Sequence, residues 1–258
     1  MTHTERNPKQ TRMDDVFFDA SELTVKPAYV SFVDIMGMAT AMEWSLQKGA
    51  NFMGRFHAIL LGLKESAHGC RMYPVMDGAY IIASQYDDLL KFIKALFTRV
   101  GKVFVKADVC ESFLIRGSIA YGEIVSGMDI TPAVNRELAA DKDYKSSLLM
   151  GIAVARAFQC VSKAPPFGIY IDNSIRATHT TRISGIWYQW CRQADLTNEM
   201  KNKIAKYFNW ARDCSELLMY DDEKIAKHFK LAMQYWGVKT GGKKGSSMSE
   251  SESVEVLP

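Results

Sequence analysis

Two apolar runs that each end at an aspartate constrain the fold of this chain more than any other feature. The first run lies within residues 28–38 and ends at Asp34. The second lies within residues 73–83, where Asp77-Gly78 separates two apolar segments. Hard divalent cations bind oxygen ligands, and two carboxylates at the ends of buried strands are suited to a pair of such ions. The sequence therefore makes Asp34 and Asp77 candidate metal ligands.

The spacing of apolar residues predicts an α+β fold. Tyr29–Val33 is too short and too apolar for a surface helix, which predicts a central strand buried on both faces. Asp77-Gly78 between apolar runs is a strong hairpin signal, and turn chemistry alone would also account for an aspartate there. The tryptophans of the C-terminal segments are best explained by core packing; they are Trp187, Trp190, Trp210 and Trp236.

Further elements follow from the same spacing. In the first half we predict two helices from Met38 to about Glu65 with a break near Gly49, strands at Cys70–Met76 and Ala79–Ala83, and a helix at Tyr86–Val100. In the second half we predict a strand at Ser112–Val125, a polar loop at 127–147, a helix at Leu148–Val161, a strand at Gly168–Asp172, and helices at about 195–218 and 221–236. This order is the ferredoxin-like plan, βααββαβαβ, with a helical C-terminal extension.

The length of 258 residues allows one large domain with appendages. We predict a flexible N-terminal arm over residues 1–26 and an α+β domain over 27–175. A helical extension follows over 176–237. Residues 238–258 are rich in Gly, Lys, Ser and Glu, a composition that predicts a disordered tail.

Composition excludes several classes of function. The net charge of +3 and the lack of a continuous basic tract argue against binding to nucleic acid. No apolar run approaches the roughly 20 residues of a membrane span, and the polar N-terminus does not resemble a signal peptide. The five cysteines include no Cys-x-x-Cys pair, which favours reduced thiols. We therefore expect a cytoplasmic protein without a membrane anchor.

Two further residues stand out beside the aspartates. Gly37 follows Asp34 closely and allows the backbone to approach a ligand. Arg116 interrupts an apolar strand. Its side chain is either ion-paired for structural reasons or part of a functional site, and the sequence leaves both explanations open.

Four motifs, taken in order, resemble the catalytic domain of class III nucleotidyl cyclases. Residues 32–37 are similar to the family's Phe-x-Asp-Ile-x-Gly metal motif. Residues 76–78 occupy the place of its second metal aspartate, although the family usually has glycine before that aspartate rather than after it. Residues 116–122 resemble its Gly-Ile-x-x-Gly strand, and 151–157 occupy the place of its Gly-x-x-Val-Asn-x-Ala helix. The resemblance covers about residues 28–172.

The resemblance implies two Mn²⁺ or Mg²⁺ ions in each site and a homodimer with sites between its subunits. The implied metal ligands are the carboxylates of Asp34 and Asp77 and the backbone carbonyl of Ile35. Phe32 would wall the ribose or phosphate pocket, backbone amides up to Gly37 would hold the triphosphate, and Arg116 or Arg156 would offset charge on the α-phosphate.

Departures from the family bear on the substrate. Tyr73 stands where adenylyl cyclases have a base-reading lysine, and Leu148 where they have a base-reading aspartate. Both are candidates for the nucleoside pocket. The transition-state Asn and Arg of the family are replaced by Ala155 and Gln159. Neither purine-reading side chain is therefore present.

A compact, divergent cyclase of this kind most resembles the pyrimidine cyclases of bacterial Pycsar anti-phage systems. That resemblance implies conversion of UTP to 3′,5′-cyclic UMP as an infection signal to a separate effector. A cytidylate cyclase that makes cyclic CMP is the nearest alternative. A cyclase-like module that binds nucleotide without turnover is another, and a diguanylate-type cyclase is disfavoured because the Gly-Gly-Asp/Glu-Glu-Phe signature is absent.

Overall fold

A computed structural model describes residues 17–67, 69–178, 185–216, 218 and 220–237. Most of the predicted N-terminal arm, residues 1–16, lies outside the described residues, as does the whole predicted tail. No helix in these ranges is long and apolar enough to cross a membrane.

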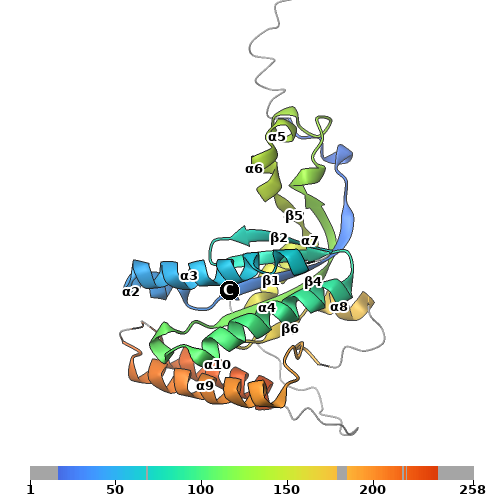
Figure 1. The fold of residues 1–258 in the computed structure, drawn as a ribbon. Helices are drawn as coiled ribbons and strands as arrows, with labels where there is room; N and C mark the ends of the chain where they lie inside the picture. The colour runs from blue at the N-terminus through green and yellow to red at the C-terminus, as the bar shows by residue number, and fades with distance from the viewer. Residues whose placement is uncertain (1–16, 68, 179–184, 217, 219, 238–258) are drawn as a thin grey trace, which may run out of the picture.

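A six-stranded sheet forms the centre of the molecule (Figure 1). Its strands are β1 (Lys26–Ile35), β2 (Cys70–Val75), β3 (Gly78–Ala83), β4 (Ile115–Ser126), β5 (Leu149–Gly151) and β6 (Ile169–Ile171). The order across the sheet is β2-β3-β1-β4-β5, and β6 pairs with the other half of β4. Only the β4–β6 pairing is parallel among the described strand pairs. The central position of β1 places any residue at its end between two neighbouring strands.

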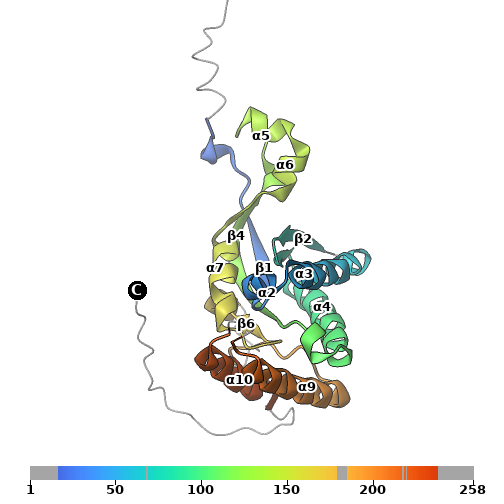
Figure 2. The ribbon, with the colours of Figure 1, turned by 90° about the vertical axis from the view of Figure 1, so that its left-hand side faces the viewer.

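Helices cover both faces of this sheet. They are α2 (Met38–Trp44), α3 (Leu46–Leu61), α4 (Tyr86–Lys106), α5 (Arg136–Ala140), α6 (Lys142–Ser147), α7 (Ile152–Cys160), α8 (Asn173–Thr178), α9 (Ala194–Asp213) and α10 (Asp222–Gly237). Figure 2 shows α7 on one side of β1 and β4, with α3 and α4 on the other. The order of elements confirms the α+β, ferredoxin-like βααββαβαβ plan, with β5 as an additional short strand.

Alternation along β1 produces two hydrophobic cores, because successive side chains of a strand point to opposite faces. Val33 and Ile35 belong to the larger core, which α3 and α4 cover. Val30 and Phe32 belong to the smaller core beneath α7. Asp34 has the same parity as Phe32, so its carboxylate emerges on the α7 face, just beyond the end of the smaller core.

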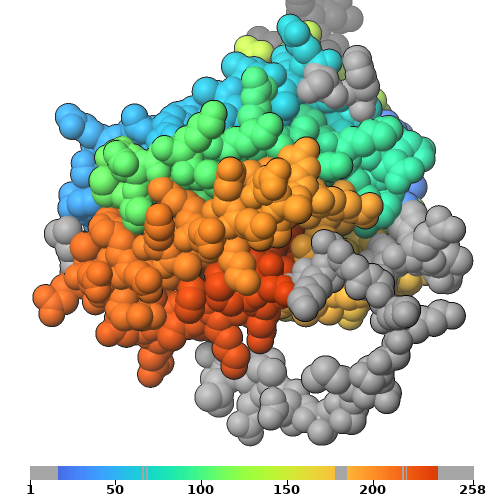
Figure 3. All heavy atoms as spheres, turned by 60° about the horizontal axis from the view of Figure 1, so that its bottom comes forward, coloured from blue at the N-terminus to red at the C-terminus, as the bar shows by residue number. Residues whose placement is uncertain are grey.

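The C-terminal helices complete the larger core. Met200 and Phe208 of α9 and Trp236 of α10 are buried in the same cluster as the sheet residues. Trp190 precedes α9 and is only 1% exposed; its indole Nε1 donates to the Phe167 carbonyl oxygen at 2.8 Å. Figure 3 shows α9 and α10 forming one surface with α4. The prediction that the tryptophans pack in a core is confirmed for Trp190 and Trp236.

The structure corrects several predicted boundaries. The helix predicted from Leu148 begins only at Ile152, after β5, and the helix predicted to end at Val100 continues to Lys106. The helix break expected near Gly49 falls at Ser45, whose extended backbone (φ −158°) ends α2 and whose Oγ accepts from the Lys48 amide at 3.3 Å to cap α3. The predicted loop over 127–147 contains the short helices α5 and α6. Asn135 and Asp141 cap these helices through their side chains, a local interaction that apolar periodicity does not report.

Candidate active site

Three charged side chains meet at the C-terminal end of β1. In the sheet register Asp34 lies opposite Gly78 of β3 on one side and Arg116 of β4 on the other. Directly opposite residues of antiparallel strands point to the same face. The Arg116 guanidinium accordingly forms an ion pair with the Asp34 carboxylate, with Nη2 3.4 Å from Oδ2. Arg116 is therefore ion-paired, as the structural explanation requires, and it also lies at the candidate site, because its partner Asp34 is a candidate metal ligand.

The hairpin that carries Asp77 is anchored beside Asp34. Its two loop residues are Met76 and Asp77, one position earlier than the predicted Asp77-Gly78, because Gly78 already pairs with Val75. The Ile35 amide donates to the Asp77 carbonyl oxygen at 3.3 Å. On the other side the His57 Nε2 lies 2.9 Å from the Met76 carbonyl oxygen. These two contacts fix the turn against β1 and α3.

Glycine is required at two positions around the aspartates. A Cβ at Gly78 would lie 2.6 Å from the Val33 carbonyl oxygen, so only glycine lets β3 approach β1 closely there. Gly37 adopts a left-handed backbone with φ of 74°, and a Cβ there would meet no atom within 4 Å. Space therefore remains open beside Gly37, as a site for a ligand requires.

The electrostatics of Asp34 favour a bound cation. Burial raises the pKa of the Asp34 carboxyl from 3.8 to about 6, Arg116 opposes the rise, and the Asp77 carboxylate adds to it. Like charges held together repel, and a divalent cation between them removes that cost. Both carboxylates are hard oxygen donors, and the Ile35 backbone lies beside them. The donor set thus fits Mn²⁺ or Mg²⁺, although no group of three or more His, Cys, Asp or Glu side chains occurs in the described ranges.

The raised pKa of Asp34 predicts a specific dependence of stability on pH. Between pH 3.8 and about 6 the folded chain retains a proton that the unfolded chain has released. The free energy of unfolding should therefore fall as pH rises through this window, and Asp34→Asn should lack that component. Urea unfolding should be measured in chelator at several values between pH 4 and pH 7. As pH rises, the free energy of unfolding of Asp34→Asn should increase relative to that of the parent chain. A constant difference across the range would contradict the assignment.

The remaining predicted site residues are placed differently. Phe32 is buried in the core beneath α7, two residues before Asp34, and its ring lies against Gly78. Tyr73 is buried in the same core, and its hydroxyl lies 3.0 Å from the Ser126 Oγ. Leu148 directly precedes β5, which pairs with the far end of β4. Ten residues of β4 separate Ser126 from Arg116 along the strand. Arg156 is exposed on α7.

One chain therefore brings together Asp34, Asp77, Arg116, the Ile35 backbone and Gly37. It does not bring Leu148 to them, and no contact joins Arg156 to them. His57 was not predicted from the sequence. Its position one turn before the end of α3 does not distinguish it from many other histidines in helices. The sequence around His57 therefore gave no reason to select it.

Comparison with known proteins finds the same fold. No family model matches the sequence, and no curated protein matches it. A bacterial light-regulated adenylyl cyclase superposes over 76% of this chain and 66% of that chain, with a TM-score of 0.51 and 10% identity. A double mutant of the guanylyl cyclase domain of the RhoGC fusion protein from the aquatic fungus Blastocladiella emersonii covers 63% of this chain and 88% of that one, with a TM-score of 0.47 and 15% identity. The first superposition shows that the chain has the fold of an adenylyl cyclase.

Proposed function

We propose that the protein is a nucleotidyl cyclase that converts a nucleoside triphosphate to a 3′,5′-cyclic monophosphate and pyrophosphate. The observation that carries the proposal is the proximity of Asp34, at the end of β1, to Asp77, in the turn just before its register partner Gly78, with Arg116 paired to Asp34. The cyclase fold supports it.

The reaction places clear demands on the site. The ribose 3′-oxygen loses its proton and attacks the α-phosphorus, while the bond to the β-phosphate oxygen breaks and pyrophosphate leaves. Two divalent cations would stabilise the negative charge on the attacking and leaving oxygens and lower the pKa of the hydroxyl. Asp34 and Asp77 would hold these ions, and the Ile35 carbonyl would complete one site. Arg116 would exchange its carboxylate partner for a phosphate oxygen and offset the charge there.

UTP is the proposed substrate, which gives cyclic UMP as a signal in antiviral defence that acts on a separate effector. The support is the similarity to pyrimidine cyclases together with the absence of purine-reading side chains. Tyr73 is already hydrogen-bonded to Ser126 and buried to 7% exposure, so its hydroxyl is not free to replace a base-reading lysine. Leu148 carries no group that hydrogen-bonds an adenine amine.

The test is an assay of the purified chain with Mn²⁺ and each of the four ribonucleoside triphosphates. We expect cyclic UMP as the main product. Cyclic CMP as the main product would replace UTP by CTP, and cyclic AMP as the main product would reject the pyrimidine assignment. No product from any of the four nucleotides would favour the second candidate, a nucleotide-binding module without turnover. Ala155 supports that candidate, because it cannot make the hydrogen bond of the family's transition-state asparagine.

A homodimer is part of the proposal. Within one chain Leu148 directly precedes β5 at the far end of β4, and Arg156 makes no described contact with Asp34; two-fold pairing is the means by which a partner would supply them. Large apolar side chains are exposed on the hairpin, β5 and α7: Val75 (39%), Met76 (82%), Met150 (38%), Ile152 (48%) and Phe158 (58%). Self-association would remove this apolar surface from water.

Composite sites predict complementation between two inactive variants. Asp34→Asn and Arg156→Ala should each abolish most product formation, because each dimer then lacks one component in both sites. An equal mixture should recover about a quarter of the parental activity, since half of the dimers are mixed and each mixed dimer has one intact site. Co-expression with two different affinity tags isolates the mixed dimer for measurement. Activity no greater than that of the separate variants would contradict sites shared between chains.

A further inference from the structure

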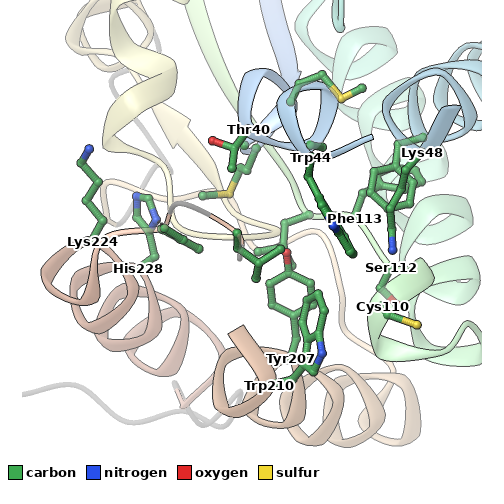
Figure 4. A pocket seen from close by; sticks show the side chains of 18 of the residues that line it. Thr40, Trp44, Lys48, Cys110, Ser112, Phe113, Tyr207, Trp210, Lys224 and His228 are labelled. Atoms are coloured by element: carbon green, nitrogen blue, oxygen red, sulfur yellow. Dashed lines mark hydrogen bonds between the residues drawn. The ribbon is translucent and has the colours of Figure 1, made fainter. Parts of the chain in front are cut away.

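A cavity of about 240 Å³ lies between the β1–α2 turn and the C-terminal helices. Figure 4 shows its walls, with Thr40 and Trp44 from α2 on one side and Tyr207 and Trp210 from α9 on the other. His228 of α10 closes the cavity at one end. Neither Asp34 nor Asp77 lines it, although Gly37 and Arg116 beside them do.

Flat aromatic rings form much of the lining. Tyr207 and Trp210 lie with their ring centroids 5.7 Å apart, and Trp44 and Phe113 face them across the space. The Lys48 ammonium lies 4.1 Å from the centroid of the Trp44 ring. Walls of this kind favour a planar ring that can stack on them.

The charge of the lining is uniformly positive or neutral. Arg116, Lys48 and Lys224 contribute to it, and no Asp or Glu is among its residues. Arg116 pairs with Asp34 and Lys48 with Glu111, whereas the Lys224 ammonium forms no ion pair within the described part of the chain. Arg116 also retains a buried Nε without a hydrogen-bond partner there. An anionic group on a bound molecule would be attracted to this lining.

His228 does not add to the positive charge. Burial, together with the nearby charges of Arg116, Lys227 and Lys224, lowers its pKa to about 4. Its Nδ1 is hydrogen-bonded to the Tyr220 hydroxyl. At neutral pH the histidine and tyrosine therefore present a neutral, already paired wall at that end of the cavity.

The size of the cavity limits the ligand. A dry cavity of about 150 Å³ accepts benzene. A volume of about 240 Å³ accordingly leaves room for two fused rings and a small substituent. The space is too small to enclose a whole nucleoside triphosphate.

From the aromatic walls, the unpaired Lys224 and the volume, we propose that this cavity is a binding site for a small bicyclic aromatic carboxylate. The site adjoins the substrate site, since Gly37 and Arg116 line the cavity and also belong to the group of residues around Asp34. Arg116 joins the two, since its side chain lines the cavity and contacts Asp34. Binding of the aromatic acid does not depend on the proposed cyclase activity.

The experiment is calorimetric titration of the full chain, in chelator and without nucleotide, with 2-naphthoate, 1-naphthoate and indole-3-carboxylate in turn. We expect saturable binding of at least one probe, one per chain, with a Kd on the order of 100 μM. The uncharged 2-naphthol should bind at least about tenfold more weakly than 2-naphthoate. Failure of all three acids to bind below about 5 mM, or equal binding of the naphthol, would overturn the proposal.

Two variants test the location. Lys224→Ala should weaken binding about tenfold, whereas Lys230→Ala, which removes another exposed lysine of the same helix that does not line the cavity, should not. Cys110→Trp introduces a large side chain at the exposed rim of the cavity and should abolish binding. Unchanged affinity in Lys224→Ala or Cys110→Trp, with thermal unfolding showing that the variant is folded, would place the ligand elsewhere and reject the site.

Competition separates this site from the substrate site. Saturating Mn²⁺ and UTP should change the apparent affinity for 2-naphthoate up to a limit, as coupled sites do. An increase in Kd without limit as UTP rises would show that both bind one site, and would overturn the inference while leaving the cyclase assignment intact. Conversely, an inactive chain that binds 2-naphthoate would leave the cavity site intact.

Discussion

Asp34→Asn and Asp77→Asn should each lower the rate of cyclisation by about 10³-fold or more, since a metal site is worth several kcal/mol in such a transition state. Each substitution retains the size of the side chain and removes the charge that holds the cation. Product formation with UTP and Mn²⁺, measured by chromatography, gives the rates. The two aspartates should have similar effects, because they contribute to one site.

A matched control is Asp195→Asn, which changes an exposed aspartate in the first turn of α9. It should leave the rate within about twofold of the parent, because the residue is far from both carboxylates in the chain and forms no part of the site. Full activity in either active-site variant would reject two-metal catalysis at this strand end. Loss of activity in all three variants would instead point to a general effect of acidic charge.

Phe208→Ala should lower the free energy of unfolding by about 3–5 kcal/mol. Phe208 is 0% exposed in α9 and shares the larger core with the sheet and α4. Its ring centroid lies 5.6 Å from that of Tyr207 and 5.8 Å from that of Phe229 in α10. Removing it leaves a cavity among packed rings. Urea unfolding followed by tryptophan fluorescence measures the loss.

Leu61→Ala is the corresponding control, because Leu61 lies at the end of α3 and is 65% exposed. Its effect should stay within about 0.5 kcal/mol. If Phe208→Ala were as mild as Leu61→Ala, α9 would not be part of the core on which the sheet depends. If the unfolding curve of the parent chain showed two separate transitions, the C-terminal helices would melt on their own.

Much of the fold was predictable because local patterns determine it. The apolar run before Asp34 indicates a buried strand, and Asp77 between two apolar runs indicates a hairpin. Alternation and helical spacing then give the order of elements. The candidate site was proposed from the same signals, and the plan does bring Asp34 and the Asp77 turn to the same end of neighbouring strands.

The remaining features depend on contacts between distant segments, which a linear pattern does not contain. The pairing of Arg116 with Asp34 needs the register of β4 against β1. The anchoring of the Asp77 turn by His57 needs α3 to lie beside it. The cavity needs α9 and α10 to be docked, and the aromatic spacing of Tyr207 and Trp210 predicts only that some surface covers them.

The continuity of the larger core limits how this chain can be divided into fragments that fold independently. One continuous hydrophobic cluster includes Ala79 of β3, Phe97 of α4 and Trp236 of α10. Moving the carboxylate pair into another scaffold would therefore require α9 and α10 to be moved with it. Truncation before these helices would expose the apolar residues that they cover. The choice of residue at buried positions of α10 is restricted in the same way, because these side chains belong to the same core as residues near the N-terminus, such as those of β1.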